Sequence, residues 1–217
     1  MLFRSLTAGR TPRHFLRQQL GVHPNEPLVV VTPGGGGDGQ RLIHTYLESV
    51  RQQTIAAKPI PKTVIISGPE MPADQQHQFE TQVAPYPNVQ LLEFSDDLIS
   101  YLNAADAVVA MAGYNTTGEI LSRRKPAVVV PRTRPVQEQW MRAKRFAKSG
   151  LLYAIHPQKL TPQALSQTLA QAHTTKPYAI NTFRLDGLPR IAQLMQGLMP
   201  SVSHTSSRDL AALSCAL

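Results

Sequence analysis

Residues 96–143 read DDLISYLNAADAVVAMAGYNTTGEILSRRKPAVVVPRTRPVQEQWMRA. They contain two short apolar runs, 107–112 and 126–131, and each run stops at turn residues that lead into a helical pattern. A strand that ends where a helix begins is the repeating unit of an open parallel sheet, and the strand ends gather its ligand-binding groups. This stretch therefore predicts a parallel α/β sheet with a binding site beyond two strand ends.

The same alternation of strand and helix patterns continues on both sides of this stretch. Most of the strand candidates are continuously apolar, as expected for strands buried on both faces. The six candidates are 28–32, 63–67, 89–94, 107–112, 127–131 and 151–156. Helical patterns lie between them, at 40–56, 73–83, 97–104, 116–122 and 137–148. This succession predicts an α/β fold with a doubly wound parallel sheet of about six strands.

The length and composition bound the organisation of the chain. Its 217 residues are 42% hydrophobic, which is enough for the core of one α/β domain with tails. We predict an N-terminal helix and connector (1–26), a binding domain (27–199) that ends in two further helices at 162–172 and 182–199, and a disordered tail (200–217).

Cysteine usage and hydropathy favour a cytoplasmic protein. The single cysteine, Cys215, lies in the Ser/Ala-rich tail, so no disulfide framework exists and a reducing compartment fits best. No apolar run approaches the ~20 residues that a membrane span needs. The first ten residues lack the apolar core and cleavage site of a secretory signal peptide.

The net charge of +8 is concentrated in one segment. Residues 120–150 contain nine basic residues and one acid, Glu138, and so carry as much net charge as the whole chain. A basic surface of this kind attracts phosphates, anionic lipid or nucleic acid. Aromatic residues make up only 6% of the chain and no nucleic-acid-binding motif is present, so we expect no nucleic acid partner. A solvated helix face is the plain alternative.

The first strand candidate ends in a glycine-rich loop, PGGGGDG (33–39). Glycines such as Gly35, Gly36 and Gly37 let a ligand approach the backbone amides, and a loop between strand and helix can cradle phosphate. The loop matches neither the dinucleotide-binding spacing nor the Walker lysine pattern. A flexible connection is the alternative, and Asp38 would repel a phosphate placed beside it.

The ends of the fourth and fifth strand candidates supply Gly113, Glu119 and the polar cluster Gln137, Glu138 and Gln139. A nucleotide-sugar needs such groups: bare backbone for its phosphates, a carboxylate for ribose hydroxyls, and amides for the sugar.

Each of these groups also has a structural interpretation. Thr116 and Glu119 fit a helix capping box, Gly113 fits a tight turn, and Gln137–Gln139 fit an ordinary polar first turn. Arg132 and Arg134 lie beyond a strand end, where guanidinium groups pair with phosphate or are simply solvated. No histidine spacing or Asp-x-Asp pair indicates a metal site.

The segment 89–131, VQLLEFSDDLISYLNAADAVVAMAGYNTTGEILSRRKPAVVVP, followed by QEQW and a basic helix, resembles the C-terminal, donor-binding half of GT-B glycosyltransferases. The similarity is greatest to the MurG-type N-acetylglucosamine transferases and related predicted glycosyltransferases, and it covers roughly 28–156. It implies a Rossmann-like sheet that forms one half of a GT-B fold.

The resemblance also implies roles for individual residues. Phe94 and Ser95 match the backbone that contacts uracil, and Glu119 matches the ribose-binding carboxylate. Glu138 and Gln139 match two sugar-binding glutamines, but an ionised glutamate only accepts hydrogen bonds, which leaves the sugar open. Met111 and Ala112 replace the Arg-Ser of the MurG-type turn. Gly113 and its neighbours match the helix start that faces the diphosphate. Together with the residues argued from the sequence itself, the predicted donor-binding residues are Gly35, Gly36, Gly37, Phe94, Ser95, Gly113, Tyr114, Asn115, Thr116, Glu119, Arg134, Gln137, Glu138 and Gln139.

The function implied is that of the donor-binding half of an inverting hexosyltransferase that uses a UDP-sugar, without a metal or other cofactor, on an unknown acceptor. The general base and acceptor site belong to a separate N-terminal domain in this fold, so no catalytic residue is assigned and the isolated chain is expected to be inactive. That domain or subunit is the expected partner, and the basic helix 137–148 could reach a membrane surface that carries a lipid-linked acceptor. A nucleotide-sugar epimerase of the same architecture and a non-catalytic binding subunit are the alternatives.

Overall fold

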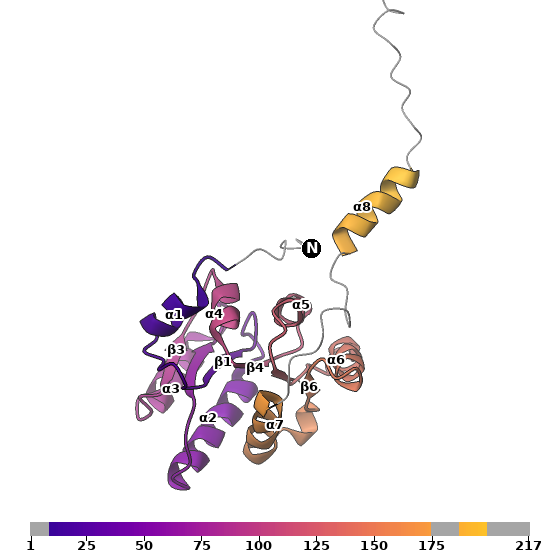
Figure 1. The fold of residues 1–217 in the computed structure, drawn as a ribbon. Coiled ribbons are helices and arrows are strands. Elements are labelled where there is room, and N and C mark those ends of the chain that lie inside the picture. The colour runs from indigo at the N-terminus through magenta and orange to yellow at the C-terminus, as the bar shows by residue number, and fades with distance from the viewer. Residues whose placement is uncertain (1–8, 175–186, 199–217) are drawn as a thin grey trace, which may run out of the picture. The chain divides into compact units, whose positions relative to one another are not determined.

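The computed structural model describes residues 9–174 and 187–198 (Figure 1). The chain divides into two units, 1–179 and 180–217. The first contains the sheet and its helices. Within the second, helix α8 (Gly187–Leu198) is described, and it has exposed apolar side chains at Ile191, Leu194, Met195 and Leu198. The predicted tail lies outside the described residues, as does the start of the helix predicted at 182–199.

A six-stranded sheet forms the centre of the first unit, and every neighbouring pair of strands is parallel. Its strands are β1 (Leu28–Thr32), β2 (Lys62–Ile66), β3 (Val89–Leu92), β4 (Ala107–Ala110), β5 (Ala127–Val129) and β6 (Tyr153–Ala154). The strand order is β3-β2-β1-β4-β5-β6, the order of a doubly wound α/β sheet whose winding direction reverses between β1 and β4. The predicted fold class is confirmed.

The helices match their predicted positions to within a few residues. They are α1 (Arg13–Gln19), α2 (Gln40–Ile55), α3 (Ala73–Val83), α4 (Leu98–Ala104), α5 (Tyr114–Ser122), α6 (Glu138–Lys148) and α7 (Pro162–Thr174). A short 3-10 helix, η1 (Pro157–Lys159), lies between β6 and α7. The difference that matters for function is at α5, which begins two residues before the predicted start and has Gly113 as its N-cap.

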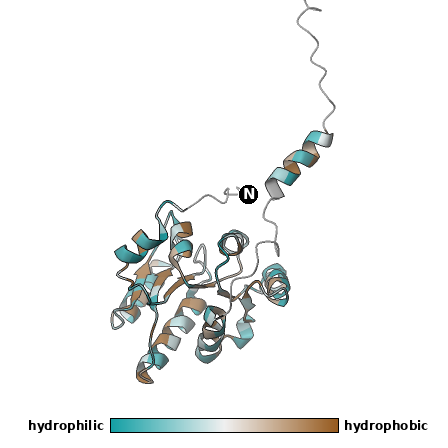
Figure 2. Cartoon of the chain, viewed as in Figure 1, coloured by the Kyte–Doolittle hydropathy of each residue, from teal (hydrophilic) through white to brown (hydrophobic). Residues whose placement is uncertain are grey.

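The core follows from the continuous apolar runs. Every residue of β1, β4 and β5 is buried, and Figure 2 shows apolar colour along the strands. Each fully buried Val or Leu side chain contributes about 1.5–3 kcal/mol to folding. The buried Tyr46 hydroxyl pairs with the Thr63 hydroxyl at 2.7 Å, and burial raises the pKa of Tyr46 to about 12. Because all residues of β1, β4 and β5 are buried, the core is apolar on both faces of these central strands.

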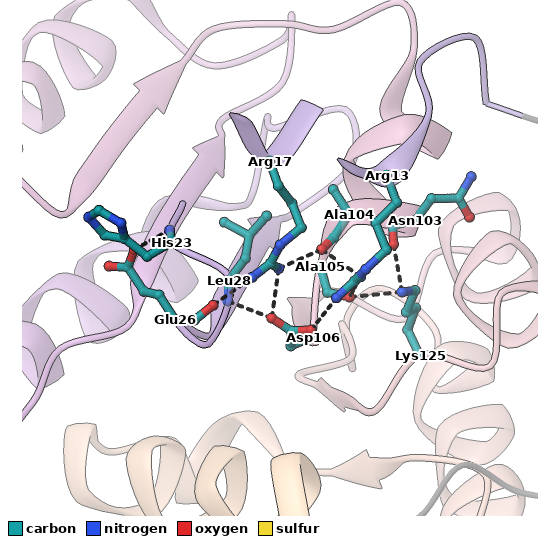
Figure 3. Close-up of polar contacts among 10 residues, drawn as sticks. All are labelled: Arg13, Arg17, His23, Glu26, Leu28, Asn103, Ala104, Ala105, Asp106 and Lys125. Carbon is teal, nitrogen blue, oxygen red and sulfur yellow. Dashed lines mark hydrogen bonds and ion pairs between the residues drawn. The ribbon is translucent and has the colours of Figure 1, made fainter. Parts of the chain in front are cut away.

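Cations gather at the C-terminal end of α4, beside the amino ends of β1 and β4 (Figure 3). Arg13 donates to the carbonyls of residues 103, 104 and 105, and the Lys125 ammonium donates to the first and last of these. Because the last carbonyls of a helix have no partner within it, positive groups are stabilising there. This contact joins α1 to α4 and to the loop before β5.

Asp106 connects the cation cluster to the sheet. Its carboxylate accepts from Arg13 at 2.5 Å, from Arg17 at 2.8 Å and from the Leu28 amide at 2.8 Å. Burial raises the pKa of Asp106, but the Leu28 amide and both guanidinium groups outweigh burial and leave it below its ordinary value of 3.8. Burial, with the charges of Arg13 and Arg17, lowers the pKa of Lys125 to about 8.

We expect Asp106→Asn to lower the free energy of unfolding by about 1–3 kcal/mol at neutral pH, because it leaves two guanidinium groups without their shared carboxylate. The folded-state pKa lies below 3.8, so the ionised carboxylate stabilises the fold above that pH. The difference between parent and variant should therefore shrink as the pH falls through the folded-state pKa. Urea unfolding across this range measures it, with the exposed Asp74→Asn in α3 as control. A difference that does not depend on pH would contradict this account.

Candidate functional site

The candidate site lies at the carboxyl ends of β1 and β4. The glycine-rich loop follows β1, and a short turn, residues 111–113, follows β4 and leads into α5. In open α/β sheets, ligands bind outside the carboxyl ends of the strands where the winding direction reverses. The geometry of these two connections therefore decides what can bind.

The glycine-rich loop is packed against the loop that follows β2. The Glu70 amide donates to the Gly35 carbonyl at 2.8 Å, and Gly36 has a φ of 101°. A Cβ atom on Gly36 would lie 2.4 Å from the Ser67 carbonyl oxygen, so the fold requires glycine there. The interpretation as a merely flexible connection is therefore wrong.

An acidic side chain that the sequence did not reveal lies against this loop. The Glu70 carboxylate is 3.0 Å from the place where a Cβ on Gly35 would stand and 3.5 Å from the corresponding place on Gly37. Like charges repel, so a phosphate is disfavoured on the side of the loop that Glu70 occupies. Binding by Gly35, Gly36 and Gly37 stays a prediction, limited to the other side.

Gly113 differs from Gly36 because neither its backbone nor its neighbours require glycine. Its φ of −58° is open to any residue, and a Cβ there would come no closer than 4.0 Å to its nearest neighbour, the Thr116 hydroxyl. No side chain caps α5 among the described residues. The site thus has an open helix N-terminus whose first amides have no intrahelical partner, an arrangement that binds anions.

The capping-box interpretation of Thr116 and Glu119 is wrong. The helix already begins at Tyr114, with the Thr117 amide bonded to the Gly113 carbonyl at 3.0 Å, so Thr116 lies inside the first turn. Thr116 is only 8% exposed. Glu119 lies in the second turn, too far along the helix to cap its start.

The loops that follow β1 and β5 are joined by an ion pair. Arg132 contacts Asp38 at 3.1 Å, and both side chains are about half exposed. The Gln139 side-chain oxygen accepts the Arg132 backbone amide, also at 3.1 Å. The Asp38 carboxylate, which would repel a phosphate, is therefore balanced by the Arg132 guanidinium. Gln139 positions the loop after β5, which contains Arg132.

Arg142 is the site residue that sequence reasoning missed. From α6 it donates to the Ala112 carbonyl at 2.7 Å and to the Glu138 carboxylate at 2.6 Å. Its guanidinium carbon lies 5.4 Å from the centre of the Tyr114 ring, within the range of a cation–π contact. The available signal was the spacing of Glu138 four residues before Arg142 on a helix. The contacts to Ala112 and Tyr114 had no signal in the sequence.

Other predicted residues lie apart from this cluster. Phe94 and Ser95 follow β3 at one edge of the sheet, and β2 and β1 separate that strand from β4. The Phe94 side chain is 57% exposed. The Ser95 hydroxyl accepts the Asp97 amide at 3.1 Å, and Asp97 caps α4, so this pair helps to start that helix. Arg134 and Gln137 are exposed beyond β5.

Within residues 9–174 and 187–198, no group of three or more His, Cys, Asp or Glu side chains is arranged to hold a metal ion. None of the helices described there is both long enough and apolar enough to cross a membrane.

Comparison with known proteins identifies the family. The model of the glycosyltransferase family 28 C-terminal domain matches residues 28–188. The chain belongs to this family. It is 27% identical over 188 residues to an uncharacterized glycosyltransferase of Methanopyrus kandleri, a match that covers 87% of this chain and 50% of the relative. The chain thus corresponds to about half of that relative.

Further relatives of this family 28 domain are N-acetylglucosamine transferases. The UDP-N-acetylglucosamine–N-acetylmuramyl-(pentapeptide) pyrophosphoryl-undecaprenol N-acetylglucosamine transferase of Streptomyces coelicolor is 31% identical over 153 residues, covering 70% of this chain and 40% of the enzyme. The enzyme of the same name from Clostridium kluyveri is 31% identical over 98 residues, covering 44% and 28%.

Solved structures support the fold. MurG of Acinetobacter baumannii superimposes with a TM-score of 0.59 at 20% identity, over 83% of this chain and 52% of MurG. The calicheamicin glycosyltransferase CalG4 gives a TM-score of 0.61 at 17% identity, over 83% and 44%. The family 28 domain therefore has the fold of one half of a GT-B glycosyltransferase.

The two glycines of the site should respond differently to alanine. Gly36→Ala forces a side chain into a positive-φ position and against a carbonyl, and should cost about 2–4 kcal/mol of unfolding free energy. Gly113→Ala should cost at most about 1 kcal/mol, the scale for losing a good N-cap residue. Urea denaturation of both variants measures the contrast. Equal losses would show that Gly113 is also held by the fold.

Proposed function

We propose that this family 28 domain is the donor-binding half of an inverting glycosyltransferase that transfers a sugar from a UDP-sugar to an acceptor. The observation that carries the proposal is the open start of α5 at the point where the sheet reverses its winding. Gly113 leaves that helix end accessible, and Arg142 adds a positive charge beside it.

We infer the nucleotide of the donor from the names of similar proteins. The family members from Streptomyces coelicolor and Clostridium kluyveri are named for transfer from UDP-N-acetylglucosamine. The glycosyltransferase VinC, which shares the fold with a TM-score of 0.54, was solved with dTDP. Both nucleotides are pyrimidine nucleoside diphosphates, so we assign a ligand of that class. The sugar stays open, because Glu138 replaces an amide that could donate as well as accept.

The layout of the sheet fits an extended ligand. Phe94 follows β3, Gly113 and Glu119 follow β4, and Gln139 follows β5. A base held near Phe94, a ribose at Glu119, a diphosphate at Gly113 and a sugar near Gln139 would run across the sheet edge. Adjacent strands lie about 4.8 Å apart, so such a ligand spans several strands.

The mechanism follows from the charge that develops on the leaving group. In an inverting transfer, the acceptor oxygen forms a bond to the anomeric carbon while the bond to the diphosphate breaks, and a general base takes the acceptor proton. The amides at the start of α5 and the Arg142 guanidinium would stabilise the departing diphosphate. These groups supply positive charge without a metal ion, and we propose that no metal or other cofactor is needed.

A second protein surface must supply the acceptor site and the general base. The chain spans half of the Methanopyrus relative, and we propose that an acceptor-binding domain or subunit faces this one. The exposed side chains of α6 include Met141, Lys144, Arg145 and Lys148. Such a face is suited to an anionic membrane surface, so we propose a cytoplasmic enzyme that meets a lipid-linked acceptor there.

The ribose role of Glu119 can be tested by binding. Glu119→Ala should weaken UDP binding by about 1.5–3 kcal/mol, the scale for hydrogen bonds to a charged group. Calorimetry with UDP in the presence of EDTA measures this effect and the absence of a metal requirement together. Glu80→Ala, an exposed acid on α3, is the control. If the Glu119 variant is folded and binds UDP as well as the parent, Glu119 has no role in donor binding.

The need for an acceptor half can be tested by activity. We expect the 217-residue chain to bind UDP but to transfer no sugar from labelled UDP-sugars to lipid or sugar acceptors, because the general base is not in this half. Adding an acceptor domain from a family 28 relative, fused or in trans, should restore transfer. Robust product from the 217-residue chain by itself would refute the proposal.

A further inference from the structure

Arg142 occupies an unusual position for a cation. Its guanidinium lies against the N-terminal end of α5, where it contacts the Ala112 carbonyl and the Tyr114 ring. That end of a helix carries the positive pole of the helix dipole, and cations are favoured at the opposite end. Two positive groups therefore meet at one place, which is unfavourable unless an anion joins them.

The anion that now meets Arg142 is weakly held. Glu138 contacts the guanidinium at 2.6 Å, but its side chain is 72% exposed, whereas that of Arg142 is only 18% exposed. An ion pair four residues apart on a helix contributes little to stability when one partner lies in water, as Glu138 does. Glu138 can therefore leave at small cost, while Arg142 is kept in place by Ala112 and Tyr114.

The guanidinium also has unused hydrogen-bonding capacity. It offers five N–H donors, and its Nε atom is buried without a hydrogen-bond partner among the residues that the structure describes. The neighbouring Arg132 is already paired with Asp38. Arg142 is thus the arginine best placed to receive an anion at the start of α5.

We propose that Arg142 binds the diphosphate of the donor by exchanging partners. Its Nη1 atom passes from the Glu138 carboxylate to a phosphate oxygen, while Nη2 keeps its bond to the Ala112 carbonyl. A diphosphate carries more charge than one carboxylate and lies at the open amides of α5, so it competes well for the guanidinium. This inference rests on the proposed function and deepens it.

The exchange has a consequence for specificity. When a phosphate replaces Glu138 at Arg142, the Glu138 carboxylate becomes available to accept hydrogen bonds from the sugar hydroxyls. Recognition of the sugar is thereby coupled to the presence of the diphosphate. Uridine, which carries no phosphate, should not cause the exchange.

The experiment is calorimetry with uridine, UMP and UDP on the parent chain and four variants. Arg142→Gln should weaken UDP binding at least tenfold and leave uridine affinity unchanged, because charge-assisted bonds are lost only to phosphate. Arg142→Lys should recover part of the loss. Glu138→Gln should strengthen UDP binding severalfold, because the competing charge is gone. Arg145→Gln, on the exposed face of the same helix, should bind all three ligands like the parent.

Each other outcome is informative. Equal UDP affinity in the parent and Arg142→Gln would overturn the inference while leaving the proposed function intact. Equal loss of uridine and UDP would also overturn it, because Arg142 would then only hold the turn after β4. Weaker UDP binding by Glu138→Gln would show that Glu138 supports Arg142 rather than competing with the ligand. A parent chain that binds neither UMP nor UDP would instead refute the proposed function.

Discussion

The parallel pairing of β1 with β4 joins strands that lie far apart in the sequence, from Val29 opposite Ala107 to Thr32 opposite Ala110. Beyond this pair the chain winds in opposite directions, and this reversal is where open α/β sheets bind their ligands. The apolar runs of both strands are fully buried, which fixes their register. The start of α5 lies at this reversal because β4, the strand before it, is paired with β1.

The helix termini at the two ends of the sheet differ in whether side chains satisfy them. At the amino end, the last carbonyls of α4 are met by Arg13, Arg17 and Lys125, and Asp106 balances part of that charge. That end is internally satisfied and needs no ligand. At the carboxyl end, the amides of α5 have no side-chain cap among the described residues, and one arginine, Arg142, lies where the helix dipole is already positive. Arg142 is paired there with the exposed Glu138, so the charge at this end, unlike that at the amino end, is balanced by an anion that water can reach.

Most of the fold could be predicted because burial on both faces of the sheet requires apolar runs that are readable along the chain. The sequence predicts that α5 starts at Thr116, because a threonine followed three residues later by a glutamate is typical of a capping box. The N-cap in the structure, Gly113, has no side chain that could signal it. Glycine is required at Gly36 but not at Gly113, because only Gly36 lies against the backbone of another loop, at Ser67. Nothing in the sequence around either glycine indicates this difference. The contacts of Arg142 with Ala112 and Tyr114 join helix α6 to the turn after β4, so only the folded chain reveals them.

The distribution of charge also explains how the work of transfer can be divided between two protein surfaces. Stabilising a departing diphosphate requires fixed positive charge and amides directed at it, and the proposed site has the Arg142 guanidinium beside the start of α5. Activating an acceptor hydroxyl requires a positioned base, which we propose a second protein surface supplies. If Glu138 leaves Arg142 when the diphosphate binds, the carboxylate moves from the leaving-group side toward the sugar hydroxyls. The donor half would then recognise the sugar and bind the leaving group in one step. An acceptor half could differ between relatives without altering that coupling.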